Sequence, residues 1–541
     1  MNLLFFGEKI MSGGTILKNG KHNLLFDGAA ALAVATAVTK VLGLLYKLPL
    51  SRILGDEGMG YFNSAYTVYT FFYILCSAGV PKAVAIVVSE NDAEGNKSGE
   101  GRIIRSALFA FFALGIAATA IFIAFAEELC VLIGNSGAAY TMTVIAPSVL
   151  FVSIAGVAKG HLSGNSRLLP LAVSQLIEGG AKFFIGVLFA VIGANRGMPL
   201  NVLSAFTVLG ITLGSAVSAV YLLITSKLTV NNSQVRPKEP STRPRKKVRK
   251  IVKIAIPLTV GAAVMSFSNL LDLGMIMQRL KSAGYSEAEA SALYGNYTTL
   301  AVPMFNLVTS LVAPFFIALL PILSRSHTLG DDFAFEAELN FTLKKAYFIA
   351  VPSSAAFIFY SKEILSLIFE SSAVETGAPL LTLLAPSLVF LTSQTLVNTA
   401  LEAKGHFKAP IVSMLVGNVP KLVISYVLIS DPRFGISAAP IGTVVAYATG
   451  FLLSLLILHV KTDVHLSLIS EFLRPASAAL AAIAVTDFVI NSIGLREGAL
   501  LNLLTLSLFG VLHLIFVGII IFADRKYRKS LSICTKKAIS N

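Results

Sequence analysis

The chain has 541 residues, of which 55% are hydrophobic and only 13% are charged, and its mean hydropathy is +0.77. Because soluble domains carry about 25% charged residues, this composition excludes a soluble globular protein and predicts an all-α polytopic membrane protein. The net charge of +14 comes from 43 Lys and Arg against 29 Asp and Glu. The three cysteines are scattered without disulfide or metal spacing, so we expect no bound metal.

Runs of about 20 apolar residues predict fourteen transmembrane helices. We place them at residues 28–50, 61–88, 103–126, 139–159, 168–192, 202–225, 251–278, 295–322, 342–368, 378–402, 410–430, 436–460, 473–493 and 500–523. Interior prolines predict kinks, which membrane helices tolerate when neighbouring groups satisfy the freed carbonyls. These prolines are Pro81, Pro147, Pro257, Pro303, Pro314 and Pro386.

The distribution of positive charge predicts the orientation of the helices. If the N-terminus is cytoplasmic, the even-numbered connections with their adjoining helix ends and the two tails hold 31 of the 43 Lys and Arg, whereas the odd-numbered connections hold 7. We therefore expect a multi-pass membrane protein with both termini in the cytoplasm, where the tails at residues 1–27 and 524–541 would lie.

The first two helices contain cations in apolar surroundings. Lys40 lies near the middle of the first helix, and Lys47 lies on the same face about 10.5 Å further along, where it could instead reach the outer interface. A cation at mid-bilayer costs roughly 2.5–3.5 kcal/mol on insertion scales, and such residues usually face a polar cavity. Lys40 is therefore the strongest candidate for substrate binding, and Lys47, Arg52 and Lys82 are further candidates.

A row of tyrosines on the second helix has two possible roles, which are stacking on sugars or anchoring and packing. The row consists of Tyr61, Tyr66, Tyr69 and Tyr73. In the fifth helix, Lys182 follows Glu178 by four residues, so it either forms an i,i+4 ion pair or binds substrate.

The stretch 226–250 is a basic linker between two halves of the chain. It is either a cytoplasmic connection that follows the charge bias or a patch for anionic lipid headgroups. Aromatic residues do not interleave with its charges, so we expect no nucleic-acid partner.

The second half contains one deep acid and one deep lysine. Asp272 in the seventh helix could pair with Lys47 across the molecule or take part in ion coupling. Lys421 in the eleventh helix has no acid four residues earlier, where Gly417 stands, so it is a candidate for substrate binding. In the last helix, His513 is interpreted as a packing residue. Cations without matching mid-membrane acids suggest that the cargo is an anion.

Matching patterns in the two halves predict an internal duplication. Tyr61, Asn63 and Pro81 recur as Tyr294, Asn296 and Pro314, and the triplet 146–148 recurs as 385–387. These matches predict an N-lobe at residues 28–225 and a C-lobe at 251–460, each of six helices, related by a pseudo-twofold axis along the membrane normal. The helices at 473–523 fall outside both copies.

Motifs of enzymatic catalysis are absent from the sequence. It contains no Walker A loop, no HExxH and no nucleophile elbow. We therefore predict no catalytic residues, no cofactor and no enzymatic activity.

Three segments resemble the multidrug/oligosaccharidyl-lipid/polysaccharide flippase superfamily, and in particular its polysaccharide-transporter branch, which includes lipid II flippases and the stage V sporulation proteins B. They are residues 39–43, 50–58 and 77–82. The resemblance implies two six-helix lobes that alternate access to a central cavity, and two terminal helices that form a groove for a polyprenyl tail. The family's cation in the first helix corresponds to Lys40. A second family arginine aligns with Tyr46, beside Lys47.

The leading hypothesis is a monomeric flippase that exports a polyprenyl-diphosphate-linked saccharide, such as lipid II or another polysaccharide precursor. Its partners would be this saccharide and the surrounding membrane lipids. The main alternative is a cation-coupled multidrug exporter of the same superfamily. Such exporters require a carboxylate in a lobe, and the first helix here has Lys40 and no acid. A third possibility is a scaffold for envelope synthesis that transports nothing.

Overall fold

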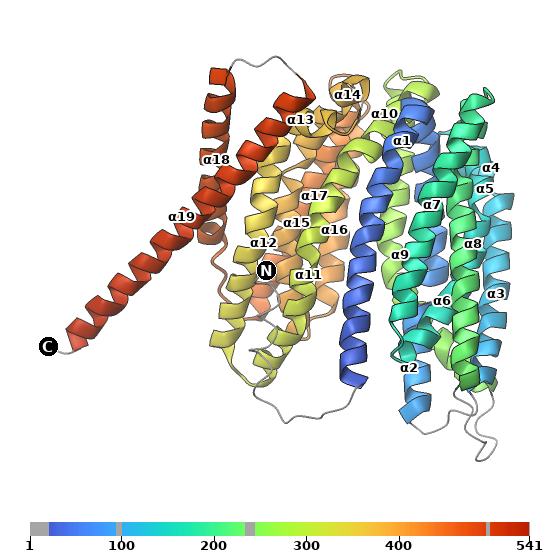
Figure 1. The fold of residues 1–541 in the computed structure, drawn as a ribbon, viewed down its shortest axis with the longest axis horizontal. Helices are drawn as coiled ribbons and strands as arrows, with labels where there is room; N and C mark the ends of the chain where they lie inside the picture. Colours follow the sequence, from blue (N-terminus) through green and yellow to red (C-terminus); the bar gives the residue numbers. More distant parts are fainter. Residues whose placement is uncertain (1–20, 94–99, 233–243, 370, 494–497, 540–541) are drawn as a thin grey trace.

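The computed structural model describes residues 21–93, 100–232, 244–369, 371–493 and 498–539. Every element in these ranges is a helix, which confirms the predicted all-α fold class. Figure 1 shows most helices running roughly parallel, as expected for segments that cross a bilayer together.

Eleven helical segments among the described residues are long and apolar enough to cross a membrane. One of them, Ala31–Asn91, contains both the first and the second predicted span. The predicted seventh and ninth spans overlap helices α9 and α12, which are not among the eleven. The number fourteen therefore stays a prediction.

The first group of helices comes from the N-terminal half of the chain (Figure 1). It consists of α1 (Lys21–Ser77), α2 (Val80–Ala93), α3 (Glu100–Ala124), α4 (Ala126–Ile133), η2 (Ser136–Ala138), α5 (Ala139–Ile145), α6 (Pro147–Gly164), α7 (Leu169–Asn195) and α8 (Leu200–Asn232).

The C-terminal half forms a second group, with two more helices at its far side. Its elements are α9 (Pro244–Ser282), α10 (Glu287–Asn296), the π-helix η3 (Tyr297–Ala301), α11 (Val302–Thr328), α12 (Asp332–Phe359), α13 (Ser361–Ser366), α14 (Ser371–Leu384), α15 (Ser387–Ala403), α16 (Lys408–Leu428), η4 (Gly435–Ser437) and α17 (Ala438–Lys461). The two further helices are α18 (Leu468–Ile493) and α19 (Ala499–Ile539), which pack against α12 and α13.

The chain reverses its direction within α1 at a single residue. Helix α1 therefore contains the first predicted span and most of the second, which continues into α2. Gly55 has φ 62° and ψ −173°, a backbone conformation that glycine adopts without steric cost. Of the six prolines predicted to kink helices, four stand at helix breaks or first turns, and Pro257 and Pro314 lie inside α9 and α11. The repeated triplets 146–148 and 385–387 both coincide with a break, between α5 and α6 and between α14 and α15.

The predicted span 342–368 differs from the observed helix. Helix α12 begins ten residues earlier, at Asp332, where the Asp331 side chain accepts a hydrogen bond from the Ala334 amide at 2.8 Å and so caps the first turn. It ends at Phe359, and the chain continues into the separate α13. The cause is that hydropathy marks the lipid-facing part of a helix, whereas capping marks where it begins.

The two groups contact each other at one end, the predicted outer side of the membrane (top of Figure 1), through α1 and α10. A Cβ atom added to Gly60 would lie 2.0 Å from the Ser291 carbonyl oxygen, and one added to Gly295 would lie 2.4 Å from the Asp56 carbonyl oxygen. Only glycine fits at these positions, and small residues allow helices in membranes to approach this closely. The crossing closes this end of the molecule.

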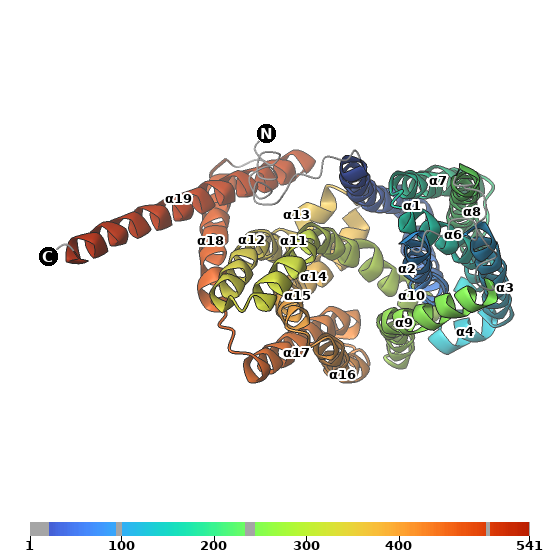
Figure 2. The ribbon, with the colours of Figure 1, turned by 90° about the horizontal axis from the view of Figure 1, so that it is seen from below.

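Helix α9 departs from the simple two-group description. The sequence assigns it to the second repeat, yet it lies along α1, α2 and α3 of the first group (Figure 2). Its main contacts with the second group are with α10, α16 and η4.

Candidate substrate cavity

A cavity of about 770 Å³ lies between the two groups. Four of the six predicted substrate-binding residues line it, namely Lys40, Lys47, Lys182 and Lys421. Asp272 is the one carboxylate in this lining. Long-range folding therefore brings together cations from α1, α7 and α16 that are up to 381 positions apart in the chain, the difference between 421 and 40.

Lys40 connects the two groups across the cavity. Its Nζ donates a hydrogen bond to the Ser310 hydroxyl on α11 at 2.7 Å, and that hydroxyl donates to the Asn306 carbonyl oxygen at 2.6 Å. Both partners are neutral. The charge of Lys40 is therefore uncompensated by these contacts and is available to an anion in the cavity.

Lys47 lies about two turns beyond Lys40 on α1, and its side chain also contacts the second group. Its Nζ donates to the Thr298 carbonyl oxygen in η3 at 2.7 Å and to Asn63 Oδ1 at 3.2 Å. Asn63 is held in place because its amide donates to Thr299 Oγ1 at 2.8 Å. This geometry differs from both sequence-based alternatives, since Lys47 neither pairs with Asp272 nor extends to the outer interface.

Lys182 is surrounded by aromatic rings rather than by an acid. Its Nζ lies 4.8 Å from the centre of the Tyr66 ring and 5.4 Å from that of Tyr46, distances at which a cation is attracted to a ring face. Of the two possibilities for Lys182, the ion pair with Glu178 is not formed, and Glu178 Oε2 lies 3.8 Å from Lys159 Nζ instead.

Lys421 forms an ion pair with Asp272, from α16 to α9. The two side chains are only 15% and 13% exposed. The absence of an acid at position 417 therefore did not leave Lys421 unpaired, because its partner comes from another helix. Asp272 thus pairs with Lys421 and not with Lys47.

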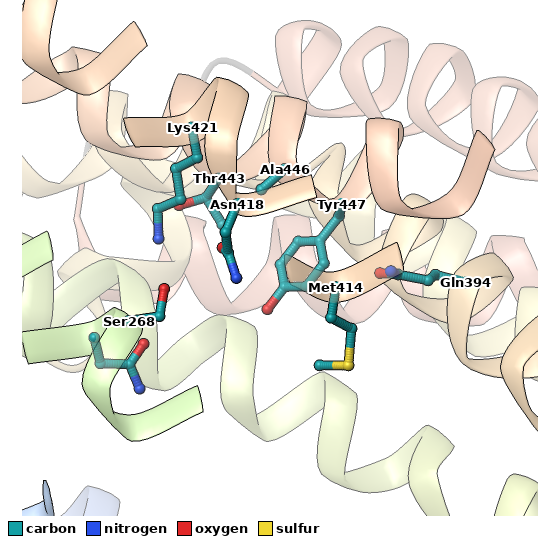
Figure 3. Close-up of a pocket in the computed structure, with 9 residues that line it drawn as sticks. Ser268, Gln394, Met414, Asn418, Lys421, Thr443, Ala446 and Tyr447 are labelled. Carbon is teal, nitrogen blue, oxygen red and sulfur yellow. The ribbon is translucent and has the colours of Figure 1, made fainter. Parts of the chain in front are cut away.

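A smaller polar recess of about 50 Å³ opens beside Lys421 (Figure 3). Amide and hydroxyl groups form most of its wall, so it offers both hydrogen-bond donors and acceptors. The polar lining residues are Ser268, Asn269, Gln394, Asn418, Lys421, Thr443 and Tyr447.

Two predicted candidates lie away from the cavity. Arg52 and Lys82 are exposed and are not among its lining residues. Of the tyrosine row, only Tyr66 lines the cavity. His513 is buried on α19, where its ring stacks at 6.1 Å on that of Phe509, as a packing residue would.

Sequence reasoning missed several polar and aromatic residues of the cavity wall. They include Tyr46, Asn63, Thr298, Asn306, Ser310, Tyr297 and Tyr447. The polar positions on η3 and α11 were a usable signal, because each polar side chain inside a membrane needs a partner or a cavity.

The charges of the cavity favour an anion with several oxygen atoms. Four ammonium groups face one carboxylate, and the contacts of Lys40, Lys47 and Lys182 described above are with neutral groups. Ammonium groups bind phosphate oxygens as point charges. The wall also presents aromatic faces and hydroxyls suitable for a polar organic group.

Comparison with known proteins agrees with this arrangement. Residues 25–327, more than half of the chain, match the model of the family described as polysaccharide biosynthesis protein, and residues 296–427 match the MatE family. The chain is 23% identical to stage V sporulation protein B of Bacillus subtilis (strain 168), over 86% of this chain and 88% of the relative. It is also 23% identical to the lipid II flippase MurJ of the same organism, over 80% and 81%.

Solved structures share the fold. The lipid II flippase MurJ in an inward closed conformation has a TM-score of 0.67 at 17% identity and covers 92% of this chain and 99% of its own. An inward-facing multidrug resistance MATE family transporter of the MOP superfamily has a TM-score of 0.63 at 14% identity, over 81% and 99%. These likenesses confirm the predicted multi-pass helical fold, and the two family matches agree with the predicted superfamily. Their names denote flippases and transporters and no enzyme, in agreement with the predicted lack of enzymatic activity.

Proposed function

Because the chain belongs to the polysaccharide biosynthesis protein family, we propose that it is a flippase for an undecaprenyl-diphosphate-linked sugar. The cargo would be lipid II or another precursor of cell-wall, polysaccharide or spore-envelope synthesis. It would be exported across the cytoplasmic membrane by alternating access between the two groups of helices.

The observation that carries the proposal is the uncompensated positive charge of the cavity. Lys40, Lys47 and Lys182 face it from the N-terminal group with neutral partners. A diphosphate brings about two negative charges, which these ammonium groups would partly desolvate and bind. The saccharide would lie against the aromatic and hydroxyl groups of the wall, and the polyprenyl tail would stay in lipid beside α18 and α19.

The membrane potential supports the proposed direction of transport. With both termini in the cytoplasm, an inside-negative potential favours outward movement of an anion by about 2.3 kcal/mol per charge per 100 mV. A diphosphate could therefore be exported without ATP hydrolysis, for which the sequence has no motif.

A cation-coupled multidrug exporter is the second candidate, supported by the match to the MatE family. Such an exporter would need a carboxylate that binds the coupling cation. Asp272 is the one carboxylate lining the cavity, and the Lys421 ammonium already neutralises it. The geometry therefore favours the anionic lipid.

The decisive residue for a test is Lys40. Lys40→Ala should abolish flipping of the lipid-linked sugar, while Lys40→Arg should retain it because arginine keeps the charge and also binds phosphate. The measurement follows which lipid-linked sugar accumulates in the inner leaflet when each variant replaces the depleted native protein.

Lys82→Ala is the matched control, since Lys82 is an exposed lysine outside the cavity lining. It should behave as the native protein does. Native transport by Lys40→Ala would contradict the anion-cavity mechanism and would favour the exporter or the scaffold.

A further inference from the structure

Helix α9 is attached by packing to the N-terminal group, although it belongs by sequence to the C-terminal repeat. Ile251 and Ala255 are buried in one cluster with Val80, Val84 and Ile103 of α2 and α3. A Cβ atom on Gly79 would lie 2.2 Å from the Ala255 carbonyl oxygen, so the backbones of these two segments are in contact. Apolar packing this close makes the two elements move together.

Polar contacts extend the attachment along the length of α9. The Gly79 amide donates to Thr259 Oγ1 at 3.2 Å. Near the N-terminal end of α9, Lys250 pairs with Glu90 at 2.6 Å. Near its other end, the Gln278 side chain donates to the Leu132 carbonyl oxygen.

Apart from the ion pair of Lys281 with Glu287 on the adjoining α10, the polar contacts from α9 to the described part of the C-terminal group are with α16. Arg279 Nε donates to the Tyr426 carbonyl oxygen at 2.9 Å, and its guanidinium lies 4.1 Å from the centre of the Tyr426 ring. About two turns earlier on α9, Asp272 pairs with Lys421. The ion pair therefore joins a helix fixed to the first group with a helix of the second.

We propose that the Asp272–Lys421 ion pair is a latch between the two moving groups, which the anionic substrate opens by competing with Asp272 for Lys421. This inference rests on the proposed function. Both residues line the cavity, so a bound diphosphate can reach Lys421. Among the four cavity lysines, Lys421 has an anionic partner in the contacts described, whereas the other three have neutral ones.

The physical basis is the cost of breaking a buried ion pair. Separating the pair in an empty cavity would leave both the ammonium and the carboxylate without a counterion, which is strongly unfavourable. A diphosphate lowers this cost because it supplies Lys421 with a new counterion. Its own charge also repels Asp272, and this repulsion drives α9 away from α16. The empty transporter is thereby held closed, and the loaded one is released.

The latch can be observed as a distance between α9 and α16. We would attach spin labels at Phe267→Cys and Val423→Cys, both exposed positions, in full-length protein whose native cysteines are replaced by alanine. The protein would be placed in nanodiscs, and undecaprenyl diphosphate would be the probe. With Asp272 and Lys421 both present, the distances between the two labels should be short and narrowly distributed without the probe, and longer with it.

Variants of the pair separate the latch from simple binding. Asp272→Asn and Lys421→Gln should both show the longer distance without probe. Asp272→Asn should bind the probe more tightly, by about fivefold or more, because the competition for Lys421 is lost, and a coupling energy is shared by both equilibria. Lys421→Gln should bind it more weakly. The charge swap, D272K combined with K421D, should restore the short distance between the labels. That result would also show that the fold tolerates changes at both positions.

Each outcome bears on a different claim. If the native protein binds the probe and the distance does not change, or if Asp272→Asn leaves both distance and affinity unaltered, the latch is overturned and the proposed function is untouched. If the native protein does not bind the probe at all, the proposed function fails, and the substrate-opened latch fails with it.

Discussion

The cavity lysines differ in their partners, and Lys182 is the one held by aromatic rings. Lys182→Met keeps the length of the side chain over Tyr66 and Tyr46 and removes the charge. Because a hydrogen bond to a charged group contributes about 1.5–3 kcal/mol, we expect binding of undecaprenyl diphosphate to weaken by about tenfold or more. Titration of the probe into protein in nanodiscs measures the change.

The control is Lys227→Met, which removes an exposed lysine of α8 outside the cavity lining. It should leave probe affinity unchanged. Equal affinities of the two variants would exclude Lys182 from the substrate site.

At the residue scale, the sequence predicted which lysines are unusual and not what they contact. Depth in an apolar run was enough to select Lys40, Lys182 and Lys421, because an unsolvated cation is costly wherever the helix lies. The partner of Lys421 is 149 positions away, and a local search at i±4 could not find it. The same local rule offered Glu178 as one possible partner of Lys182, and the structure does not contain that pair.

At the scale of elements, the crossing of α1 and α10 controls closure of the predicted outer end. Gly60→Val places a side chain where Cβ alone would meet the Ser291 carbonyl oxygen at 2.0 Å. We expect the helices to stay apart and transport to fall. A cysteine at Thr298, which lines the cavity, should then be labelled from outside by an impermeant maleimide, whereas it is protected when Gly60 is present.

Gly510→Val is the comparison, because a Cβ at Gly510 of α19 meets no atom within 4 Å. It should leave Thr298→Cys protected. Protection that persists in Gly60→Val would show that the crossing does not gate the cavity.

The helices themselves were predictable from apolar runs, and their ends were not. Hydropathy reports contact with lipid, so the charged first turns of α12 were assigned to a connection, although Asp331 caps a helix there. The reversal at Gly55 depends on one positive φ angle, which the apolar pattern does not encode.

At the scale of the whole molecule, the orientation in the membrane is the most direct prediction. Charge asymmetry places both termini inside, so cysteines at the exposed positions Glu128 and Glu289 should react with an impermeant maleimide added to intact cells. A cysteine at Arg249, within the basic linker, should react only after the membrane is permeabilised. Labelling of Arg249→Cys in intact cells would reverse the orientation and with it the direction of transport.

Repeated motifs predict a duplication, whereas no pattern in the sequence predicted the placement of α9. Such motifs indicate common ancestry of two segments. Packing depends instead on which apolar surface a helix covers, and Ile251 and Ala255 cover the surface of α2 and α3 in the other group. The last two helices lie outside both groups, as the sequence indicated.

The placement of α9 also bears on how the protein is made. Ribosomes deliver the helices in chain order, and domains generally fold as units during synthesis. Here the first repeat is not fully packed when α8 emerges, because Ile251 and Ala255 of α9 complete the buried cluster around Val84 and Ile103. The nascent chain must therefore keep an unfinished face in the bilayer while the linker is synthesised. The two repeats mature as interleaved units, and the natural point of division in biogenesis falls after residue 282 and not within the linker.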